Sequence, residues 1–304
     1  MNPAISGLWP ALLHPLTDQG NLDFAQATAH AKNMLAAGCD GVTLFGTTGE
    51  GPAFGVFERM ALLDTMLAAG VRADQLVVTI STVALPEAIA LGQHALKRGV
   101  QRQMLMPPFY FKQPRDAGIV QAVSDVVQGI GSEDLHLVLY HFPAISTAGF
   151  SHAAIAELLR RHPKQIVGVK DSSADLSHTL GLVAAFPTLS VLVGAEPHIA
   201  PVMRAGGAGT ICGLANVAPN LTRRIVSAPA ALSPSDEQLM AGLLAVHAVL
   251  PDLPFVPVYK TMLAEQSGDD SWLKVRAPLS PLEPHEEQTV RQAYRALGDS
   301  LLAC

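Results

Sequence analysis

Lys170 is the residue of this 304-residue chain whose type and position most clearly suggest chemistry. It closes the run Gln165-Ile-Val-Gly-Val-Lys170, which is apolar enough to be an interior strand. Burial disfavours the charged form of an amine, and a free amine beside a carbonyl group is the nucleophile that forms a Schiff base. A structural lysine paired with the neighbouring Asp171 is the alternative. The pattern predicts either imine chemistry at this position or an ion pair at the end of a strand.

Two other strand ends carry polar groups. The segment Gly46-Thr47-Thr48-Gly49-Glu50-Gly51 follows an apolar run, and its hydroxyls and backbone N–H groups would make a cradle for an anion. No Gly-Lys-Ser/Thr follows, so a carboxylate is a more natural guest than a polyphosphate. Tyr140 ends the run Leu135-His-Leu-Val-Leu-Tyr140, and a phenol there can relay protons. The alternatives are a simple turn and a tyrosine whose hydroxyl lies in water.

The elements that must position these residues alternate along the first two-thirds of the chain. Short apolar runs predict eight strands, and amphipathic stretches predict a helix in each of the seven gaps. Continuous apolar strands separated by helices are typical of a parallel sheet covered by helices. The first strand ends in His14-Pro15-Leu16-Thr17 without the glycine fingerprint of an open nucleotide-binding sheet, which favours a closed (β/α)8 TIM barrel. The predicted strands are 7–14, 41–45, 76–81, 103–106, 135–140, 166–170, 190–193 and 209–213, and the predicted helices are 23–37, 56–69, 86–97, 116–129, 152–161, 176–184 and 198–205.

After about residue 219 the rhythm changes to helices separated by prolines. The segments 221–227, 236–249, 258–266 and 284–302 are predicted to be helical, and none of the intervening segments resembles a strand. We therefore expect a barrel domain over residues 1–218, followed over 219–304 by the last barrel helix and a helical C-terminal extension.

Composition and charge exclude several classes of function. Charged residues make up 15% of the chain, the net charge is −6 and no basic stripe occurs, which argues against nucleic acid. We find neither a cationic signal peptide at the start nor an apolar run of about 18 residues, so no membrane span is expected. Three separated cysteines, Cys39, Cys212 and Cys304, fit a reducing cytoplasmic location. The eleven histidines show no metal-binding spacing, so we expect neither a metal nor a cofactor.

Together these segments resemble the dihydrodipicolinate synthase / N-acetylneuraminate lyase family of Schiff-base barrel enzymes. The resemblance runs along nearly the whole chain in the family's order, and the ordered set is far more specific than any one of its pieces. Its pieces are Gly46-Thr-Thr-Gly-Glu50, Glu58-Arg59, Pro108-Phe-Tyr110, Tyr140-His-Phe-Pro143, Gly168-Val-Lys-Asp-Ser-Ser173, Ala215-Asn216-Val217, Pro257-Val-Tyr-Lys260 and Arg276-Ala-Pro-Leu279.

The resemblance implies a mechanism and an assembly. A 2-oxo acid, typically pyruvate, would condense with Lys170 while its carboxylate is held by Thr47 and Thr48, and Tyr140 would shuttle the proton. Tyr110 would reach across a dimer interface towards a neighbouring site, in a homodimer or homotetramer. Gly46 and Ile211, the latter in the eighth predicted strand, complete the expected substrate contacts.

Departures from the family pattern bear on the substrate. Dihydrodipicolinate synthases carry an arginine where this chain has Ile145, and an isoleucine cannot pair with a carboxylate unless Arg102, Lys112 or Arg115 compensates. Glu196 lies where lyases of the family contact substrate hydroxyls, although a solvated carboxylate is the alternative there. We therefore expect a lyase that cleaves, forms or dehydrates a 2-oxo-3-deoxy sugar acid or a similar compound. The alternatives are a 4-hydroxy-tetrahydrodipicolinate (dihydrodipicolinate) synthase and a non-catalytic barrel that binds a 2-oxo acid.

Overall fold

All eight predicted strands are present in the computed structural model, which describes residues 5–252 and 254–298. The strands are parallel and follow the order β1-β8-β7-β6-β5-β4-β3-β2. A bridge between Ala11 and Thr43 joins the two ends of this order and closes the sheet, which confirms the TIM barrel. The strands are β1 (Gly7–Pro10), β2 (Val42–Leu44), β3 (Leu76–Thr79), β4 (Arg102–Leu105), β5 (His136–His141), β6 (Ile166–Asp171), β7 (Ser190–Val193) and β8 (Gly209–Cys212).

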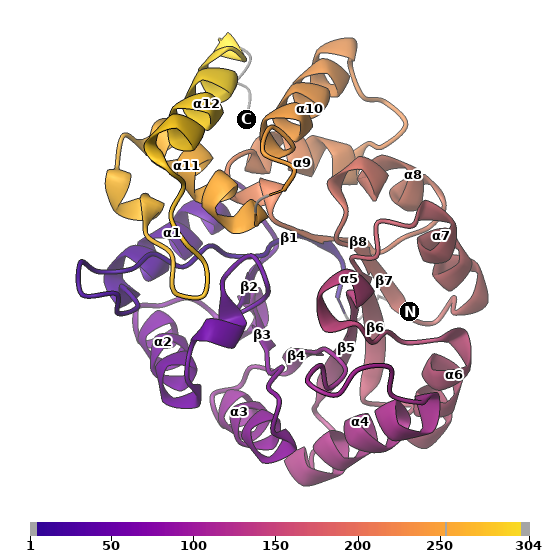
Figure 1. The fold of residues 1–304 in the computed structure, drawn as a ribbon. Helices are drawn as coiled ribbons and strands as arrows, with labels where there is room; N and C mark the ends of the chain where they lie inside the picture. Colours follow the sequence, from indigo (N-terminus) through magenta and orange to yellow (C-terminus); the bar gives the residue numbers. More distant parts are fainter. Residues whose placement is uncertain (1–4, 253, 299–304) are drawn as a thin grey trace.

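Helices surround the barrel, and each predicted one is found (Figure 1). Several begin at a side chain that accepts a backbone N–H of the first turn, as Asp23, Ser151 and Asp175 do, which explains why these helices start where they do. The helices around the barrel are α1 (Phe24–Ala36), α2 (Val56–Ala68), α3 (Leu85–Lys97), α4 (Asp116–Ile130), α6 (His152–Arg161), α7 (Leu176–Ala185), α8 (Ile199–Arg204) and α9 (Pro219–Ser227). The short helix α5 (Pro143–Ser146) was not predicted, and 3-10 turns occupy Gly51–Ala53, Ala73–Gln75, Glu196–His198, Leu214–Asn216 and Asp270–Leu273.

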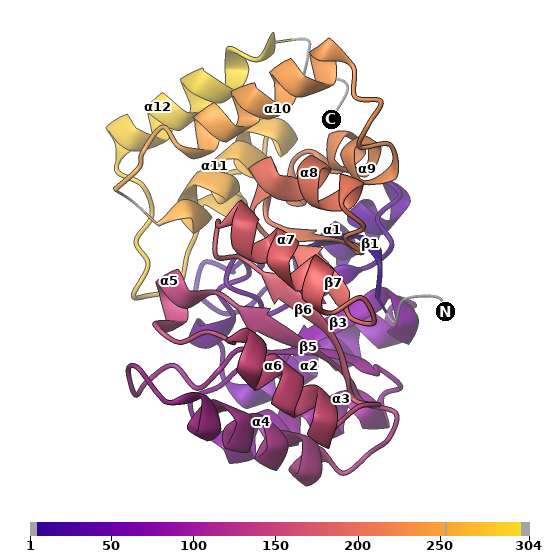
Figure 2. The ribbon, with the colours of Figure 1, turned by 90° about the vertical axis from the view of Figure 1, so that its right-hand side faces the viewer.

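The predicted C-terminal helices are also present, as α10 (Pro234–His247), α11 (Phe255–Ser267) and α12 (Pro284–Arg295). They lie together against one side of the barrel (Figure 2). The last predicted helix was drawn to residue 302, and residues 299–302 lie outside the described part of the chain. The division of the chain at residue 218 stays a prediction.

The first strand is shorter than predicted, because β1 ends at Pro10 rather than at residue 14. The chain nevertheless stays attached to both neighbouring strands beyond that point. Ala11 donates its N–H to the carbonyl of Cys212 and Leu12 donates to Thr43, both at 2.9 Å. This extended segment carries His14 to the carboxyl end of the barrel, where the loop after β2 lies.

Two layers of apolar side chains form the core. One fills the space between strands and helices, and the other fills the barrel interior, where Trp9, Met104, Val138 and Leu192 are buried. Packing on both faces explains why the strands appear as continuous apolar runs rather than as alternating ones.

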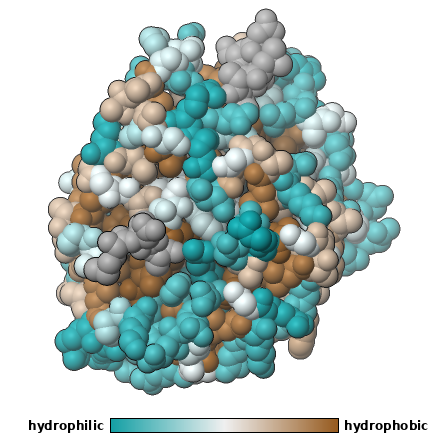
Figure 3. Space-filling model, turned by 180° about the vertical axis from the view of Figure 1, so that it is seen from behind, coloured by the Kyte–Doolittle hydropathy of each residue, from teal (hydrophilic) through white to brown (hydrophobic). Residues whose placement is uncertain are grey.

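The surface at the amino ends of the strands mixes hydrophilic residues with smaller hydrophobic patches (Figure 3). Among the described residues, no helix has the length and apolar character needed to cross a membrane. Cys39 and Cys212 are free and buried, and Cys304 lies outside the described residues.

Candidate active site

Lys170 and Tyr140 lie side by side in the barrel interior. Strands β5 and β6 pair in a register that sets Tyr140 opposite Lys170, and both side chains therefore point inward. Lys170 Nζ lies 4.2 Å from the centroid of the Tyr140 ring. The exposed fractions are 3% for Lys170 and 2% for Tyr140. An amine and a phenol are thus held together at the carboxyl end of the barrel, where barrel enzymes carry their chemistry.

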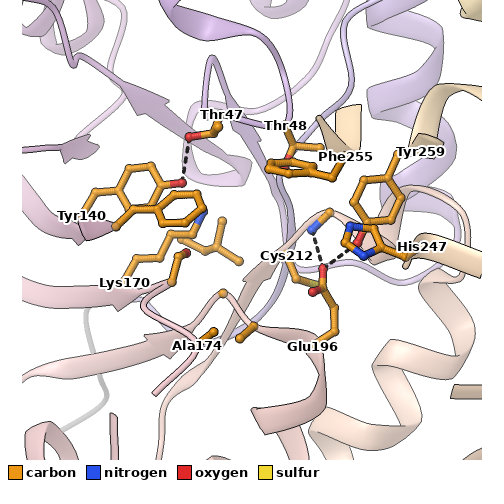
Figure 4. Close-up of a pocket in the computed structure, with 16 residues that line it drawn as sticks. Thr47, Thr48, Tyr140, Lys170, Ala174, Glu196, Cys212, His247, Phe255 and Tyr259 are labelled. Atoms are coloured by element: carbon orange, nitrogen blue, oxygen red, sulfur yellow. Dashed lines mark hydrogen bonds between the residues drawn. The ribbon is translucent and has the colours of Figure 1, made fainter. Parts of the chain in front are cut away.

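The loop after β2 brings a hydroxyl to this pair. Thr47 Oγ1 lies 3.0 Å from the hydroxyl oxygen of Tyr140, within hydrogen-bond distance (Figure 4). The loop turns through left-handed conformations at Phe45 and Glu50, with φ values of 60° and 55°. At Gly51 a Cβ atom would lie 1.8 Å from the carbonyl oxygen of Phe45, so the turn requires glycine there. The glycines of this segment shape a loop that presents Thr47 to Tyr140.

A buried ion pair supports the same loop from the C-terminal helices. Lys260 Nζ lies 2.5 Å from Glu50 Oε1, and the two side chains are 0% and 1% exposed. The other carboxylate oxygen of Glu50 accepts the N–H of Arg276 at 2.7 Å, and Lys260 also donates to the carbonyl of Lys274 at 2.6 Å. Burial lowers the pKa of Lys260, while Glu50 opposes that shift. The loop after β2 is therefore anchored to α11 and to the segment before α12.

Two arginines complete this support. Arg276 pairs with Glu58 through two parallel bonds of 2.9 Å. The buried Arg59 donates to the carbonyls of Gly51 and Ser81. Glu58, Arg59, Lys260 and Arg276 therefore hold the loop after β2 in shape. All four belong to segments outside the barrel strands that carry the family resemblance.

His14 contacts the loop from the other side. Its Nδ1 lies 2.6 Å from the carbonyl oxygen of Gly49, so Nδ1 must carry the proton and donate it. Burial lowers the pKa of His14 to about 3, which keeps the ring neutral. A Cβ atom on Gly49 would lie 2.8 Å from this ring, so the close approach requires glycine.

A second set of polar side chains, which we call the polar wall, lies opposite Lys170 and Tyr140 (Figure 4). It consists of Glu196, Tyr259 and His247. Glu196 Oε1 accepts the Tyr259 hydroxyl at 3.0 Å and the N–H groups of Gly213 and Leu214 at 3.1 Å each. Burial, followed by the charge of Glu196, raises the pKa of Tyr259 well above its usual value, so the phenol keeps its proton. Burial also lowers the pKa of His247. The wall therefore presents one carboxylate beside two neutral groups.

The polar wall and the set formed by Lys170, Tyr140 and Thr47 face one pocket of about 220 Å³ (Figure 4). Aromatic and aliphatic side chains separate them, and the volume suits a small organic acid rather than a dinucleotide. The lining residues are Thr47, Thr48, Tyr140, Phe142, Lys170, Ser172, Ala174, Gly194, Ala195, Glu196, Ile211, Cys212, Gly213, His247, Phe255 and Tyr259.

Comparison with known proteins identifies the family. The family model described as the dihydrodipicolinate synthetase family matches residues 4–297. The chain belongs to this family. An uncharacterized DapA-like lyase of Chloroflexus aurantiacus is 32% identical over 294 residues, which are 96% of this chain and 96% of that protein.

Solved structures agree with this assignment. The crystal structure of dihydrodipicolinate synthase from Agrobacterium tumefaciens str. C58 superimposes with a TM-score of 0.89 at 33% sequence identity, covering 97% of this chain and 100% of that one. The crystal structure of KD(P)GA from T. tenax gives a TM-score of 0.83 at 26% identity, covering 95% of this chain and 98% of that one. The predicted family and the predicted lyase class are confirmed.

Most of the residues predicted for the site line the pocket. Thr47, Thr48, Tyr140, Lys170, Glu196 and Ile211 do so, whereas Gly46 is buried in the loop beside them. Glu196 is half-buried and three donors bind one of its carboxylate oxygens, so it is not a freely solvated side chain; its contact with substrate stays a prediction.

Two predicted site residues do not line the pocket. Tyr110, in the loop after β4, is 66% exposed and lies at right angles to the ring of Phe111. Ile145, on the short helix α5, is 51% exposed. A contribution of Tyr110 to a site therefore requires a neighbouring subunit.

The three cations considered as substitutes for an arginine at position 145 do not line the pocket either. Arg102 starts β4 at the opposite end of the barrel, where it donates to the carbonyl of Asp74. Lys112 donates to the carbonyl of Phe109, and Arg115 precedes α4 on the surface. Among the described lining residues, Lys170 is the one lysine or arginine.

Sequence reasoning missed several lining residues as members of the site. Phe142 and Tyr259 stand within segments that carry the family resemblance, so a signal for them existed. His247 and Phe255 lie on α10 and α11, and no local pattern distinguishes them from other helical residues.

Two histidines come together in the structure, although the sequence shows no metal-binding spacing for them. The potential ligand atoms of His141, Asp171 and His178 all lie within 4.8 Å of one another. The backbone N–H of Phe150 donates to His141 Nδ1 at 2.9 Å, so the neutral ring carries its proton on Nε2. The two imidazole rings are stacked 4.5 Å apart, and their in-plane lone pairs do not converge on one ion. With His178 Nδ1 2.9 Å from Asp171, the cluster fits a hydrogen-bonded link between β5, β6 and α7 better than a metal centre.

Proposed function

We propose that this chain is a Schiff-base-forming lyase that cleaves or forms a carbon–carbon bond of a 2-oxo acid. The observation that carries the proposal is the buried array of Lys170, Tyr140 and Thr47, in which an amine, a phenol and a hydroxyl lie within contact distance. Membership of the dihydrodipicolinate synthetase family supports it.

The first stage forms the imine. The free amine of Lys170 adds to the C2 carbonyl of the 2-oxo acid, while Thr47 and Thr48 hold the substrate carboxylate. Tyr140 donates its proton to the departing hydroxyl, so that water leaves and an iminium and a tyrosinate remain. The loop after β2 contributes twice to this stage. Thr47 and Thr48 hold the substrate carboxylate, and Thr47 also hydrogen-bonds to Tyr140, which donates the proton.

The second stage breaks the bond. The Tyr140 phenolate takes the proton of the substrate's C4 hydroxyl, and the electron pair of the C3–C4 bond flows into the iminium. An aldehyde leaves and an enamine stays on Lys170. Tyr140 gives this proton to C3 of the enamine, and hydrolysis of the imine by water then releases pyruvate and the amine of Lys170. The reverse sequence is an aldol condensation, and loss of water from the same imine is the related dehydration.

Electrostatics favour a neutral aldehyde as the second fragment. Lys170 is the one lysine or arginine among the described pocket residues, and it is consumed by the imine. His247 is neutral, because burial lowers its pKa, and Glu196 repels a second carboxylate. We therefore propose a 2-oxo-3-deoxy sugar acid or a similar hydroxylated 2-oxo acid as the substrate. The second candidate is a 4-hydroxy-tetrahydrodipicolinate synthase, favoured by the 33% identity to the Agrobacterium enzyme.

A competition assay separates the two candidates. Aspartate semialdehyde carries a carboxylate that finds no cation in this pocket, and a charge-assisted hydrogen bond typically contributes about 1.5–3 kcal/mol. At about 1.4 kcal/mol per tenfold, we expect kcat/KM for the semialdehyde, measured at saturating pyruvate, to be roughly one to two orders of magnitude below that for a neutral hydroxylated aldehyde. Steady-state rates measured with both aldehydes in one preparation provide the comparison. Equal or better use of the semialdehyde would favour the synthase.

We also propose that the protein lies in a reducing cytoplasmic compartment and that its smallest active unit is a dimer. The second proposal depends on an exposed apolar surface. Exposed apolar side chains follow the carboxyl ends of four neighbouring strands, β2 to β5, and a second copy would cover them. These side chains are Phe57, Val83, Tyr110, Phe111 and Ile145.

Tyr110→Phe tests this arrangement. If the Tyr110 hydroxyl completes a neighbour's proton relay, we expect the variant to keep its oligomeric state and lose roughly 10- to 100-fold in kcat, because a positioned proton donor commonly contributes at least that much. Sedimentation velocity and turnover are measured together, with Lys97→Ala at the exposed end of α3 as a control expected to retain turnover. A monomer with full activity would rule the proposal out.

A further inference from the structure

His247 is the residue of the polar wall that has no assigned task. It is the last residue of α10, and its ring lies 4.7 Å from the ring of Tyr259 and 6.0 Å from that of Phe255, measured between centroids. In the described part of the chain, no hydrogen bond uses either of its ring nitrogens, although the ring lines the pocket. A histidine on a pocket wall with both nitrogens free is available to a ligand.

Glu196 offers a second free atom beside it. Three donors occupy Oε1, and within the described residues no hydrogen bond uses Oε2. Tyr259 links the two groups, because its ring lies 4.7 Å from the ring of His247 and its hydroxyl donates to Glu196 at 3.0 Å. Figure 4 places both on the side of the pocket opposite Lys170 and Tyr140. A substrate bound as an imine on Lys170 extends its far end towards them.

The chemistry of these free atoms defines what they recognise. A neutral imidazole offers one donor and one acceptor, and a carboxylate oxygen offers acceptors alone. A hydroxyl group both donates and accepts, so it satisfies either partner. A carboxylate or phosphate on the substrate would only accept, and it would meet the charge of Glu196 without a cation to offset it.

We propose that His247 is a specificity-determining residue, which together with the free oxygen of Glu196 selects an uncharged aldehyde fragment that carries hydroxyl groups beyond the reacting carbon. The proposal rests on the proposed Schiff-base function and adds the residue that selects the second fragment. The C-terminal helix α10 thereby supplies substrate selection, whereas the barrel strands supply the bond-breaking groups.

The test compares three aldehydes in pyruvate condensation: glyceraldehyde, which is neutral and hydroxylated; propanal, which has the same chain length without hydroxyls; and glyceraldehyde 3-phosphate, which is charged. The unmodified protein is expected to prefer glyceraldehyde to either of the others by about tenfold or more in kcat/KM. Equal use of propanal, or a preference for the phosphate, overturns the inference without any variant.

Variants then locate the preference. His247→Leu is expected to lower kcat/KM for glyceraldehyde by about three- to tenfold, the range for one neutral hydrogen bond, and to leave propanal unchanged. His247→Gln, whose amide keeps a donor and an acceptor, should recover most of the loss. His285→Leu, on the exposed part of α12, is the matched control and should change neither rate. Equal losses with glyceraldehyde and propanal would overturn the assignment to His247.

One readout separates this inference from the proposed function. Borohydride trapping of pyruvate on Lys170 is measured in every variant and should be unaffected by changes at His247. Failure to trap pyruvate in the unmodified protein refutes the Schiff-base function itself. Normal trapping without any preference among the aldehydes refutes the selection by His247 alone.

Discussion

Lys170→Ala is expected to reduce turnover by roughly a thousandfold or more, the scale seen when a covalent nucleophile is removed from an active site. The reason is that neither Tyr140 nor Thr47 replaces the amine that forms the imine. The fold should survive, because alanine removes a buried amine and leaves the pairing of β5 with β6 intact. Pyruvate release from a 2-oxo-3-deoxy sugar acid measures turnover, and circular dichroism checks the fold.

The covalent adduct provides the positive result. Pyruvate and borohydride should leave a reduced pyruvyl group on Lys170 of the unmodified protein, located by peptide mass spectrometry, and none on the alanine variant. Lys97→Ala is the control, since this lysine lies exposed at the end of α3 and should affect neither turnover nor trapping. An adduct on another lysine would refute the assignment. The absence of any adduct with every 2-oxo acid tried would favour a non-catalytic binding barrel.

Lys260→Met is expected to cost about 3–5 kcal/mol of unfolding free energy, because it leaves the carboxylate of Glu50 buried without its partner. At about 2.1 cal/mol/K of unfolding entropy per residue, each kcal/mol shifts the Tm of a chain of this size by about 1.5 °C, so Tm should fall by roughly 5–8 °C. The KM for pyruvate should rise as well, since Glu50 belongs to the loop that presents Thr47. Thermal and urea unfolding measure the first effect, and steady-state kinetics the second.

The double variant and a surface pair sharpen this test. Glu50→Gln combined with Lys260→Met removes both charges and should recover much of the lost stability. Lys164→Met breaks the exposed pair of Lys164 with Glu133 and should cost less than about 1 kcal/mol. If Lys260→Met proved as stable as the unmodified protein, the ion pair would have no part in holding the loop.

The barrel and its lysine were predictable from the sequence because their signals are local. An interior strand of a parallel sheet must be apolar along its length, so the eight strands appear as runs in the sequence, and helix caps such as Asp23 and Ser151 act within one turn. A lysine that closes such a run is conspicuous for the same reason. The position of Tyr140 at a strand end allowed a proton relay, and the family resemblance then favoured that role over a tyrosine whose hydroxyl lies in water.

The assignment of supporting residues depended on the tertiary structure. Glu50 and Lys260 lie more than two hundred positions apart, and no periodicity predicts that they pair. His141 and Asp171 come together because β5 and β6 pair in register, and the turn into α7 brings His178 to them. The spacing of the histidines along the chain gave no sign of this cluster, because the closeness of these groups is a property of the sheet.

Substrate selection was likewise decided in three dimensions. The C-terminal helices were predicted as helices, but which of their residues face the pocket depends on how α10 and α11 pack against the barrel. That packing sends His247 and Tyr259 into the pocket beside Glu196. The same amphipathic pattern describes a helical residue in a pocket wall and a helical residue at any other half-buried position. The sequence therefore does not distinguish the two.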